Sequence, residues 1–302
     1  AIAWVIEMPY QFLRNLLIEG FQTGLGDAAV QIAPSLSWIA VIAIVIGVGH
    51  TARDWGLAAL AGACFLYLAV FGQWDSAMVT LASVLVAVPI GAVGGLLLGI
   101  LAYRRPWVER LLRPVLDLMQ TVPVFAYLVP ILILFGFGPV AALVATVIYA
   151  MPPMIRVTIV ALKGVPEELL EAARMMGATP RQMTWKVLVP AAVPTLMVGV
   201  NQVIMLTLNM VIIASMIGAG GLGFDVLASL RKLDIGGGIE AGLAIVVMDI
   251  ALDRTSQAFS ERRLWRQRTG NLLQRHPWSM IALLVILATF LLGLVTPAVQ
   301  SY

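Results

Sequence analysis

Residues able to support catalysis or metal binding are few in this chain. Its 302 residues include two histidines, His50 and His276, and a single cysteine, Cys64. One cysteine cannot form a disulfide within the chain, and this set does not suggest a thiol or histidine metal cluster. The Gly-x4-Gly-Lys-Ser/Thr pattern that cradles ATP phosphates does not occur in the sequence. We therefore predict no catalytic site and no bound cofactor or metal in this chain.

A second group of polar residues lies inside long apolar stretches. In a bilayer such side chains usually face a bundle interior or a water-filled cavity. We interpret them as candidates for lining a pathway, with hydrogen bonding between helices as the alternative role. The polar candidates are Gln120, Thr121, Asn201, Gln202 and Asn209.

The composition explains why these residues must be held by membrane helices. The chain is 61% hydrophobic and 12% charged, whereas about a quarter of the residues of an ordinary soluble domain are charged. Its apolar runs match the length that a helix needs to cross about 30 Å of hydrocarbon. The fold predicted is an all-α, multi-pass membrane protein of about eight spans, at residues 35–49, 56–72, 77–103, 121–137, 139–162, 192–217, 239–257 and 278–297.

Basic residues predict the orientation of these spans. Lys and Arg gather in loops that stay in the cytoplasm. Three stretches are rich in them, near residues 104–113, 163–186 and 254–275, and all three fall on one side only if spans 121–137 and 139–162 are separate. Arg231 and Lys232 are the exception. The residues around 10–17 have helical apolar spacing that suits a helix on the outer surface. A net charge of +3 does not indicate nucleic acid.

The cytoplasmic stretch 164–190 carries strong local signals for two short helices. Pro166 followed by acidic residues is typical of a helix start, and Gly177 stands where a left-handed C-terminal cap is needed. Thr179 before Pro180 predicts the start of a second helix that Pro190 ends. We assign leucines, alanines and Met176 at three- and four-residue spacing to the apolar face of the first helix. The stretch is thus either a rigid lever or a hairpin that caps the bundle.

This stretch closely resembles the EAA loop of permease subunits of binding-protein-dependent ABC importers. The resemblance lies in Glu171-Ala172-Ala173, three residues, Gly177, nine residues and the ending Val187-Leu188-Val189-Pro190, where the family pattern has Ile-x-Leu-Pro. It extends over about residues 75–257 and is most similar to the glycine betaine/proline betaine permeases. The stretches that carry this similarity are 113–123, 127–130, 151–156, 199–202, 213–217, 220–223 and 252–254.

The resemblance implies a type I ABC importer permease in a bacterial cytoplasmic membrane. It implies a permease dimer, cytoplasmic ATPase subunits that bind ATP and magnesium, and an external solute-binding protein, with alternating access driven through the loop. The chain would then comprise an N-terminal segment 1–72, a permease core 73–257, and a basic segment with an extra helix at 258–302. The residues that the resemblance assigns to ATPase coupling are Glu167, Glu168, Glu171, Ala172, Ala173, Gly177, Pro180 and Arg181.

A betaine-type solute would add aromatic residues to the candidate pathway. A quaternary ammonium has no hydrogen-bond donor and is held over aromatic faces by about 0.5 to 2 kcal/mol per ring. Phe125, Tyr127 and Tyr149 are the candidates, with core packing as the alternative. A permease for another solute, such as an amino acid or a sulfonate, remains an alternative function. A secondary transporter is a further alternative, although we find no two similar halves, which such transporters usually have.

Two further features predict helix packing. Asp249 and Asp253 lie one helical turn apart at membrane depth and need partners. Asp249 either pairs with Arg156 or is a polar feature of the subfamily, and Asp253 is expected in a salt-bridged interface near Arg254. The second feature is a small-residue face that predicts close helix contact. It consists of Gly91, Gly94, Gly95 and Gly99.

Overall fold

The structure is a computed structural model that describes residues 2–23, 30–33 and 35–262. Its contacts define two compact units. The first unit comprises residues 1–86, 135–143 and 208–302, and the second comprises residues 87–134 and 144–207. Three long helices run through both units, namely α4 (Trp74–Arg104), α7 (Pro139–Lys163) and α10 (Val189–Met216). The predicted division at residues 73 and 257 stays a prediction.

The first unit begins with an N-terminal helix followed by a small hairpin. Helix α1 (Ile2–Arg14) continues into a π-helical turn, Asn15–Glu19, and strands β1 (Phe21–Thr23) and β2 (Val30–Ala33) pair antiparallel. The predicted helix at residues 10–17 is therefore present, and Tyr10 is buried. Helices α2 (Trp38–Ala52), α3 (Trp55–Val70) and α12 (Ile235–Arg262) pack against one another.

Glycine-rich turns complete the first unit. The turn between α10 and α11 (Leu222–Lys232) contains three glycines with positive φ, a conformation that costs other residues energy. Gly138 donates its N–H to the Ile217 carbonyl (2.9 Å), and Leu222 donates its N–H to the Thr80 hydroxyl (3.0 Å). A Cβ at Gly221 would lie 2.4 Å from that hydroxyl oxygen. The close approach of the Gly221 backbone to Thr80 therefore requires glycine at position 221.

The second unit is held together by the predicted small-residue face of α4. A Cβ at Gly95 would lie 2.6 Å from Met154 Cβ, and one at Gly99 would lie 2.5 Å from Thr158 Cβ, both on α7. A Cβ at Gly91 would lie 3.3 Å from Val203 on α10. These distances are at or below the limit for ordinary van der Waals contact, so the predicted role of the glycines in close helix packing is confirmed.

The number of long apolar helices is smaller than the eight spans predicted. Within the described residues, α4, α7, α12 and the continuous helix from Pro180 are long and apolar enough to cross a membrane, and one bent pair makes a fifth. Helices α2 and α3 have 15 and 16 residues, about 22–24 Å at 1.5 Å per residue. The predicted span 278–297 and most of the segment 258–302 lie outside the described residues.

The prediction of one continuous span at 121–137 was wrong. The chain forms α5 (Pro106–Thr121), breaks, and continues as α6 (Phe125–Phe135), with an angle of 105° between the two helices. Val122 adopts an extended conformation, with φ −73° and ψ 132°. Proline disfavours the helical conformation in the residue that precedes it, so Pro123 accounts for the break between α5 and α6. We call residues 117–127 the α5–α6 bend.

Candidate functional site: a coupling loop and a bent helix pair

The predicted elbow at Gly177 is present in the second unit. Helix α8 (Glu167–Met175) begins directly after Pro166 and ends in a Schellman motif. There Gly177 donates its N–H to the Arg174 carbonyl (2.9 Å) and Ala178 donates to the Ala173 carbonyl (3.0 Å). Gly177 has φ +75°, and a Cβ there would meet no atom within 4 Å. Glycine is therefore favoured at position 177 by its backbone conformation and not by a lack of space.

A capping box starts the second arm of the elbow. Helix α9 (Pro180–Gln182) has Thr179 as its N-cap, as predicted. The Thr179 hydroxyl accepts the Gln182 N–H (3.3 Å), and the Gln182 side-chain oxygen accepts the Thr179 N–H (2.9 Å). The backbone N–H groups of Thr179 and Gln182 therefore both find hydrogen-bond acceptors within this segment.

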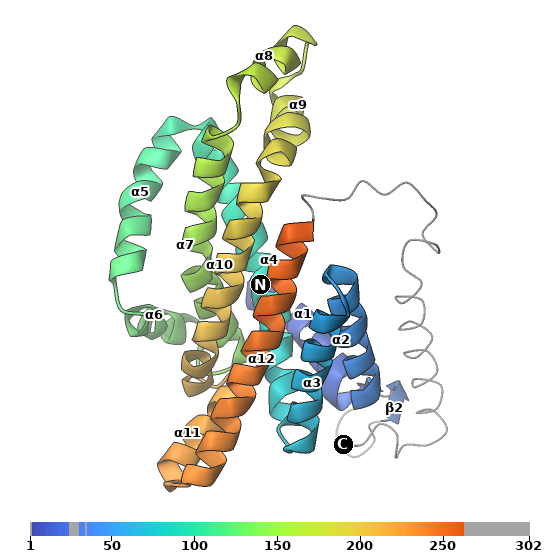
Figure 1. Cartoon of the computed structure of the whole chain (residues 1–302). Helices are drawn as coiled ribbons and strands as arrows, with labels where there is room; N and C mark the ends of the chain where they lie inside the picture. Colours follow the sequence, from blue (N-terminus) through green and yellow to red (C-terminus); the bar gives the residue numbers. More distant parts are fainter. Residues whose placement is uncertain (1, 24–29, 34, 263–302) are drawn as a thin grey trace. The chain divides into compact units, whose positions relative to one another are not determined.

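The second arm does not end at Pro190, and that prediction was wrong. Helix α9 continues through a π-helical segment, Met183–Leu188, directly into α10. The Val189 N–H bonds to the Thr184 carbonyl, and Pro190 becomes the second residue of α10, where its missing N–H is tolerated in the widened turn. The arm that follows the elbow and the long helix α10 are thus one continuous rod (Figure 1).

Fewer side chains of α8 are buried than the spacing of its apolar residues predicts. Leu170 and Ala173 are buried, and Leu170 belongs to a core cluster with Val165 and Leu188. Leu169, Ala172 and Met176 are exposed, so their assignment to that face was wrong. Met175 and Met176 are 85% and 82% exposed.

The residues assigned to coupling lie together on this loop, which we call the coupling loop (residues 164–188). Its exposed surface has a polar part and an apolar tip formed by Met175 and Met176. Arg174 forms an ion pair with Glu167 (2.8 Å) across α8. Ala173 alone of the predicted set is buried; the exposed members are Glu167, Glu168, Glu171, Ala172, Gly177, Pro180 and Arg181.

All the pathway candidates except Asn209 lie in the second unit. Four lie on the α5–α6 bend, where Gln120, Thr121 and Phe125 are exposed and Tyr127 is half-buried. The Tyr127 hydroxyl donates to the Met119 carbonyl and so closes the bend from inside. The others are half-buried Asn201 and exposed Gln202 on α10, and half-buried Tyr149 on α7. Asn209 is exposed and belongs to the part of α10 in the first unit.

Two ion pairs connect α5 to α7, and sequence reasoning missed both. Asp117 pairs with Arg156, and Glu109 pairs with Lys163 (2.6 Å) and with Arg113 (3.0 Å) on its own helix. The proposed Asp249 partner of Arg156 was therefore wrong. Asp253 accepts a hydrogen bond from Gln257 (2.7 Å), and its place in a salt-bridged interface stays a prediction. The sequence indicates that each of these charges needs a partner, because each lies close to an apolar run, but it does not indicate which partner each one takes.

Long apolar helices that pack closely at glycines, together with an exposed helical elbow, define a multi-pass helical membrane protein. Residues 91–302 match the family described as binding-protein-dependent transport system inner membrane component. The chain belongs to this family, and the predicted EAA loop falls within the matched residues.

Relatives with known names agree with this assignment. The chain is 46% identical over 84% of its length to the glycine betaine/proline betaine transport system permease protein ProW of Escherichia coli, of which it covers 68%. It is 42% identical over 80% of its length to the trimethylamine N-oxide transport system permease protein TmoV of Pelagibacter ubique, of which it covers 34%. It is 43% identical over 80% of its length to the glycine betaine transport system permease protein OpuAB of Bacillus subtilis, of which it covers 82%.

A solved structure supports the predicted fold. The chain is similar to an inward-facing structure of the MetNI methionine ABC transporter, with a TM-score of 0.56 and 27% sequence identity. The match covers 62% of this chain and 94% of the chain in that structure. The prediction of a type I ABC importer permease fold is therefore confirmed.

Proposed function

We propose that this chain is the permease subunit of an ATP-driven importer for betaine-type, quaternary-ammonium osmolytes in a bacterial cytoplasmic membrane. The observation that carries the proposal is the coupling loop, in which a capped elbow leads without a break into α10. A push on the exposed tip of this loop moves a rod long enough to span a bilayer. The names of the relatives, glycine betaine and trimethylamine N-oxide permeases, support the substrate class.

The coupling loop also supports the proposed partners. Met175 and Met176 are apolar and almost fully exposed on a loop that is too polar overall to enter lipid. Methionine adapts its shape to a partner surface, so the tip is suited to a groove of a cytoplasmic ATPase subunit that binds ATP and magnesium. The proposed assembly has two such subunits, a pair of permease chains, and an external binding protein that selects the solute.

The α5–α6 bend is where the proposed solute would meet this chain. Phe125 exposes 55% of its surface there, and Gln120 and Thr121 on the same bend are also exposed. A ring face attracts a quaternary ammonium without requiring a hydrogen-bond donor. High affinity is left to the binding protein, so transient contacts are sufficient in the permease.

Uptake in a host that lacks betaine transport tests this function. The chain is expressed with its cognate ATPase and binding protein, and uptake of radiolabelled glycine betaine, trimethylamine N-oxide, choline and methionine is measured after ion gradients are collapsed. The proposal expects uptake of at least one quaternary ammonium or amine oxide, and none when the ATPase is omitted. Uptake of methionine alone would overturn the substrate class, and uptake without the ATPase would overturn the mechanism.

A further inference from the structure

Asp117 on α5 and Arg156 on α7 form a charge pair whose role in transport rests on the proposed function. Their side chains are 63% and 40% exposed on this chain. Arg156 lies about 10 Å along α7 from Lys163 at the end of the helix. Charged side chains at such a depth avoid lipid and face protein or a water-filled cavity. The exposed side of this pair is therefore a wet or protein-covered face of the second unit.

The pair is poorly suited to a purely stabilising role. A partly exposed ion pair adds little to stability, because water screens the attraction and two long side chains lose freedom. Stability of the α5–α7 contact is already provided by apolar packing of Val108 and Leu116 on α5 against Ile155 and Ile159 on α7. The pair instead fixes the position of α5 relative to α7 at one point along each helix.

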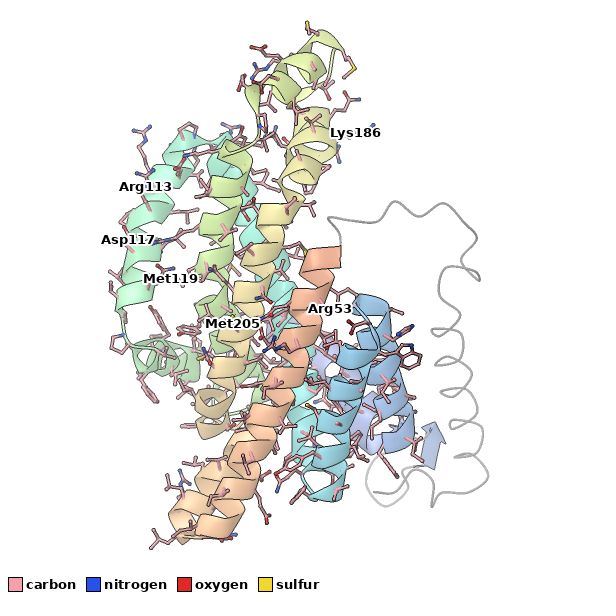
Figure 2. All side chains as sticks on the ribbon, in the orientation of Figure 1. Arg53, Arg113, Asp117, Met119, Lys186 and Met205 are labelled. Atoms are coloured by element: carbon pink, nitrogen blue, oxygen red, sulfur yellow. The ribbon has the colours of Figure 1, made fainter. Side chains whose placement is uncertain are left out.

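That point lies at the start of the α5–α6 bend. The Asp117 carbonyl accepts a hydrogen bond from the Thr121 hydroxyl (3.2 Å), and the Met119 carbonyl accepts one from the Tyr127 hydroxyl. Asp117, Met119 and Thr121 thus belong to one helical turn that is fixed on one side by Arg156 and on the other by Tyr127. Figure 2 labels Asp117 and Met119 along α5. The pathway candidates Gln120 and Thr121 lie on this same turn.

We propose that Arg156 is a positioning residue for solute passage. By pairing with Asp117 it holds the last turn of α5, and with it the polar entrance to the α5–α6 bend, in the orientation that transport requires. The Glu109–Lys163 pair joins the first turn of α5 to the last residue of α7 and is the internal control, because it lies farther from the bend than the Asp117–Arg156 pair. Disrupting the two pairs should therefore have different consequences.

The test measures the position of the bend without using any solute. In a Cys64→Ala background, Gln120→Cys reports the last turn of α5 through its rate of modification by a charged, water-soluble thiol reagent in nanodiscs. We expect Asp117→Asn and Arg156→Gln to change this rate at least about threefold, an effect of the size seen for residues that modulate coupling. Lys163→Gln should leave it unchanged. The charge-exchanged double variant Asp117→Arg with Arg156→Asp should restore the original rate.

Uptake by the same variants completes the test. Asp117→Asn should reduce uptake and the double exchange should recover it, while the amount of folded chain, followed by gel filtration, stays constant. If Arg156→Gln does not fold, Asp117→Asn and Arg156→Lys carry the comparison, and the lysine variant should retain part of the uptake. An unchanged modification rate at Gln120→Cys, or wild-type uptake despite a changed rate, would overturn the proposal. Because the modification assay needs no solute, failure of the proposed substrate class would leave its result intact.

Discussion

The coupling loop and the α5–α6 bend lie in the same unit, but different kinds of contact hold them in shape. The loop makes a sharp turn from local interactions alone, with a Schellman glycine and a capping box within residues 173–182. The bend makes its turn with a proline, and its orientation depends on Arg156, which lies 39 residues from Asp117 in the sequence. A structure made from local contacts can move as a rigid body, whereas one tied to a neighbouring helix changes when that helix moves. We infer that the loop receives force and the bend responds to it.

This difference predicts two distinct phenotypes. A change in the loop should reduce the amount of solute moved for each ATP hydrolysed, because the ATPase turns over without moving the rod. A change in the bend should slow uptake and stimulated hydrolysis together and leave their ratio constant.

The largest effect is expected for Gly177→Asp. The substitution places a non-glycine residue at φ +75° and a negative charge beside the C-terminal end of α8, where the helix dipole opposes it. We expect uptake to fall by about tenfold or more, equivalent to about 1.4 kcal/mol, with hydrolysis retained and insertion normal.

The matched control is Gly177→Asn, which has the same shape without the charge and tolerates the left-handed conformation. It should retain most of the uptake. Solute and phosphate release are measured together in proteoliposomes. Equal loss in both variants would show that the charge is unimportant, and normal uptake by Gly177→Asp would contradict the lever assignment.

A smaller effect is expected for Leu170→Ala, which tests whether the elbow must be stiff. Leu170 is 7% exposed in the cluster with Val165 and Leu188, whereas its neighbour Leu169 is 48% exposed. Removing the buried side chain should destabilise the loop by about 2 kcal/mol, the lower end for a buried leucine. Hydrogen exchange of residues 167–175 should accelerate in Leu170→Ala and stay unchanged in Leu169→Ala. Faster exchange in both, or in neither, would contradict the packing described.

The smallest effect is expected for Tyr127→Phe, which tests the bend. The variant keeps the ring and removes the hydroxyl that bonds to the Met119 carbonyl, an interaction worth about 1 kcal/mol. Uptake and stimulated hydrolysis should both fall by a few-fold, with the ratio between them unchanged. Tyr67→Phe is the control, because Tyr67 stacks on Phe71 through its ring. A lower ratio of uptake to hydrolysis in Tyr127→Phe would contradict the proposed difference between the coupling loop and the α5–α6 bend.

The comparison also shows which features the sequence could predict. Gly177, Thr179 and Pro180 act on their immediate neighbours, so the elbow was predictable from their order. The glycine face of α4 was predictable because small residues at helical spacing have few other uses in a membrane. Pro123 was available as a signal for the break in the span 121–137, but an apolar run alone favours one continuous helix.

Other features depend on tertiary contacts and could not be predicted. The pairing of Arg156 with Asp117 rather than Asp249 depends on which helices become neighbours. The continuation of α9 into α10 past Pro190 depends on a π-helical turn that no single residue signals. Met176 is 82% exposed although its spacing matches that of the buried residues Leu170 and Ala173. Each case requires knowledge of what packs against the residue.

The most direct test of the central claim is the side of the membrane on which the elbow lies and what covers it. Met176→Cys in a Cys64→Ala background is treated with a membrane-impermeant maleimide in right-side-out and inverted vesicles. We predict modification only in inverted vesicles, and protection when the cognate ATPase is bound. Modification in right-side-out vesicles, or equal modification with and without the ATPase, would contradict the proposal that this loop couples the permease to ATP hydrolysis.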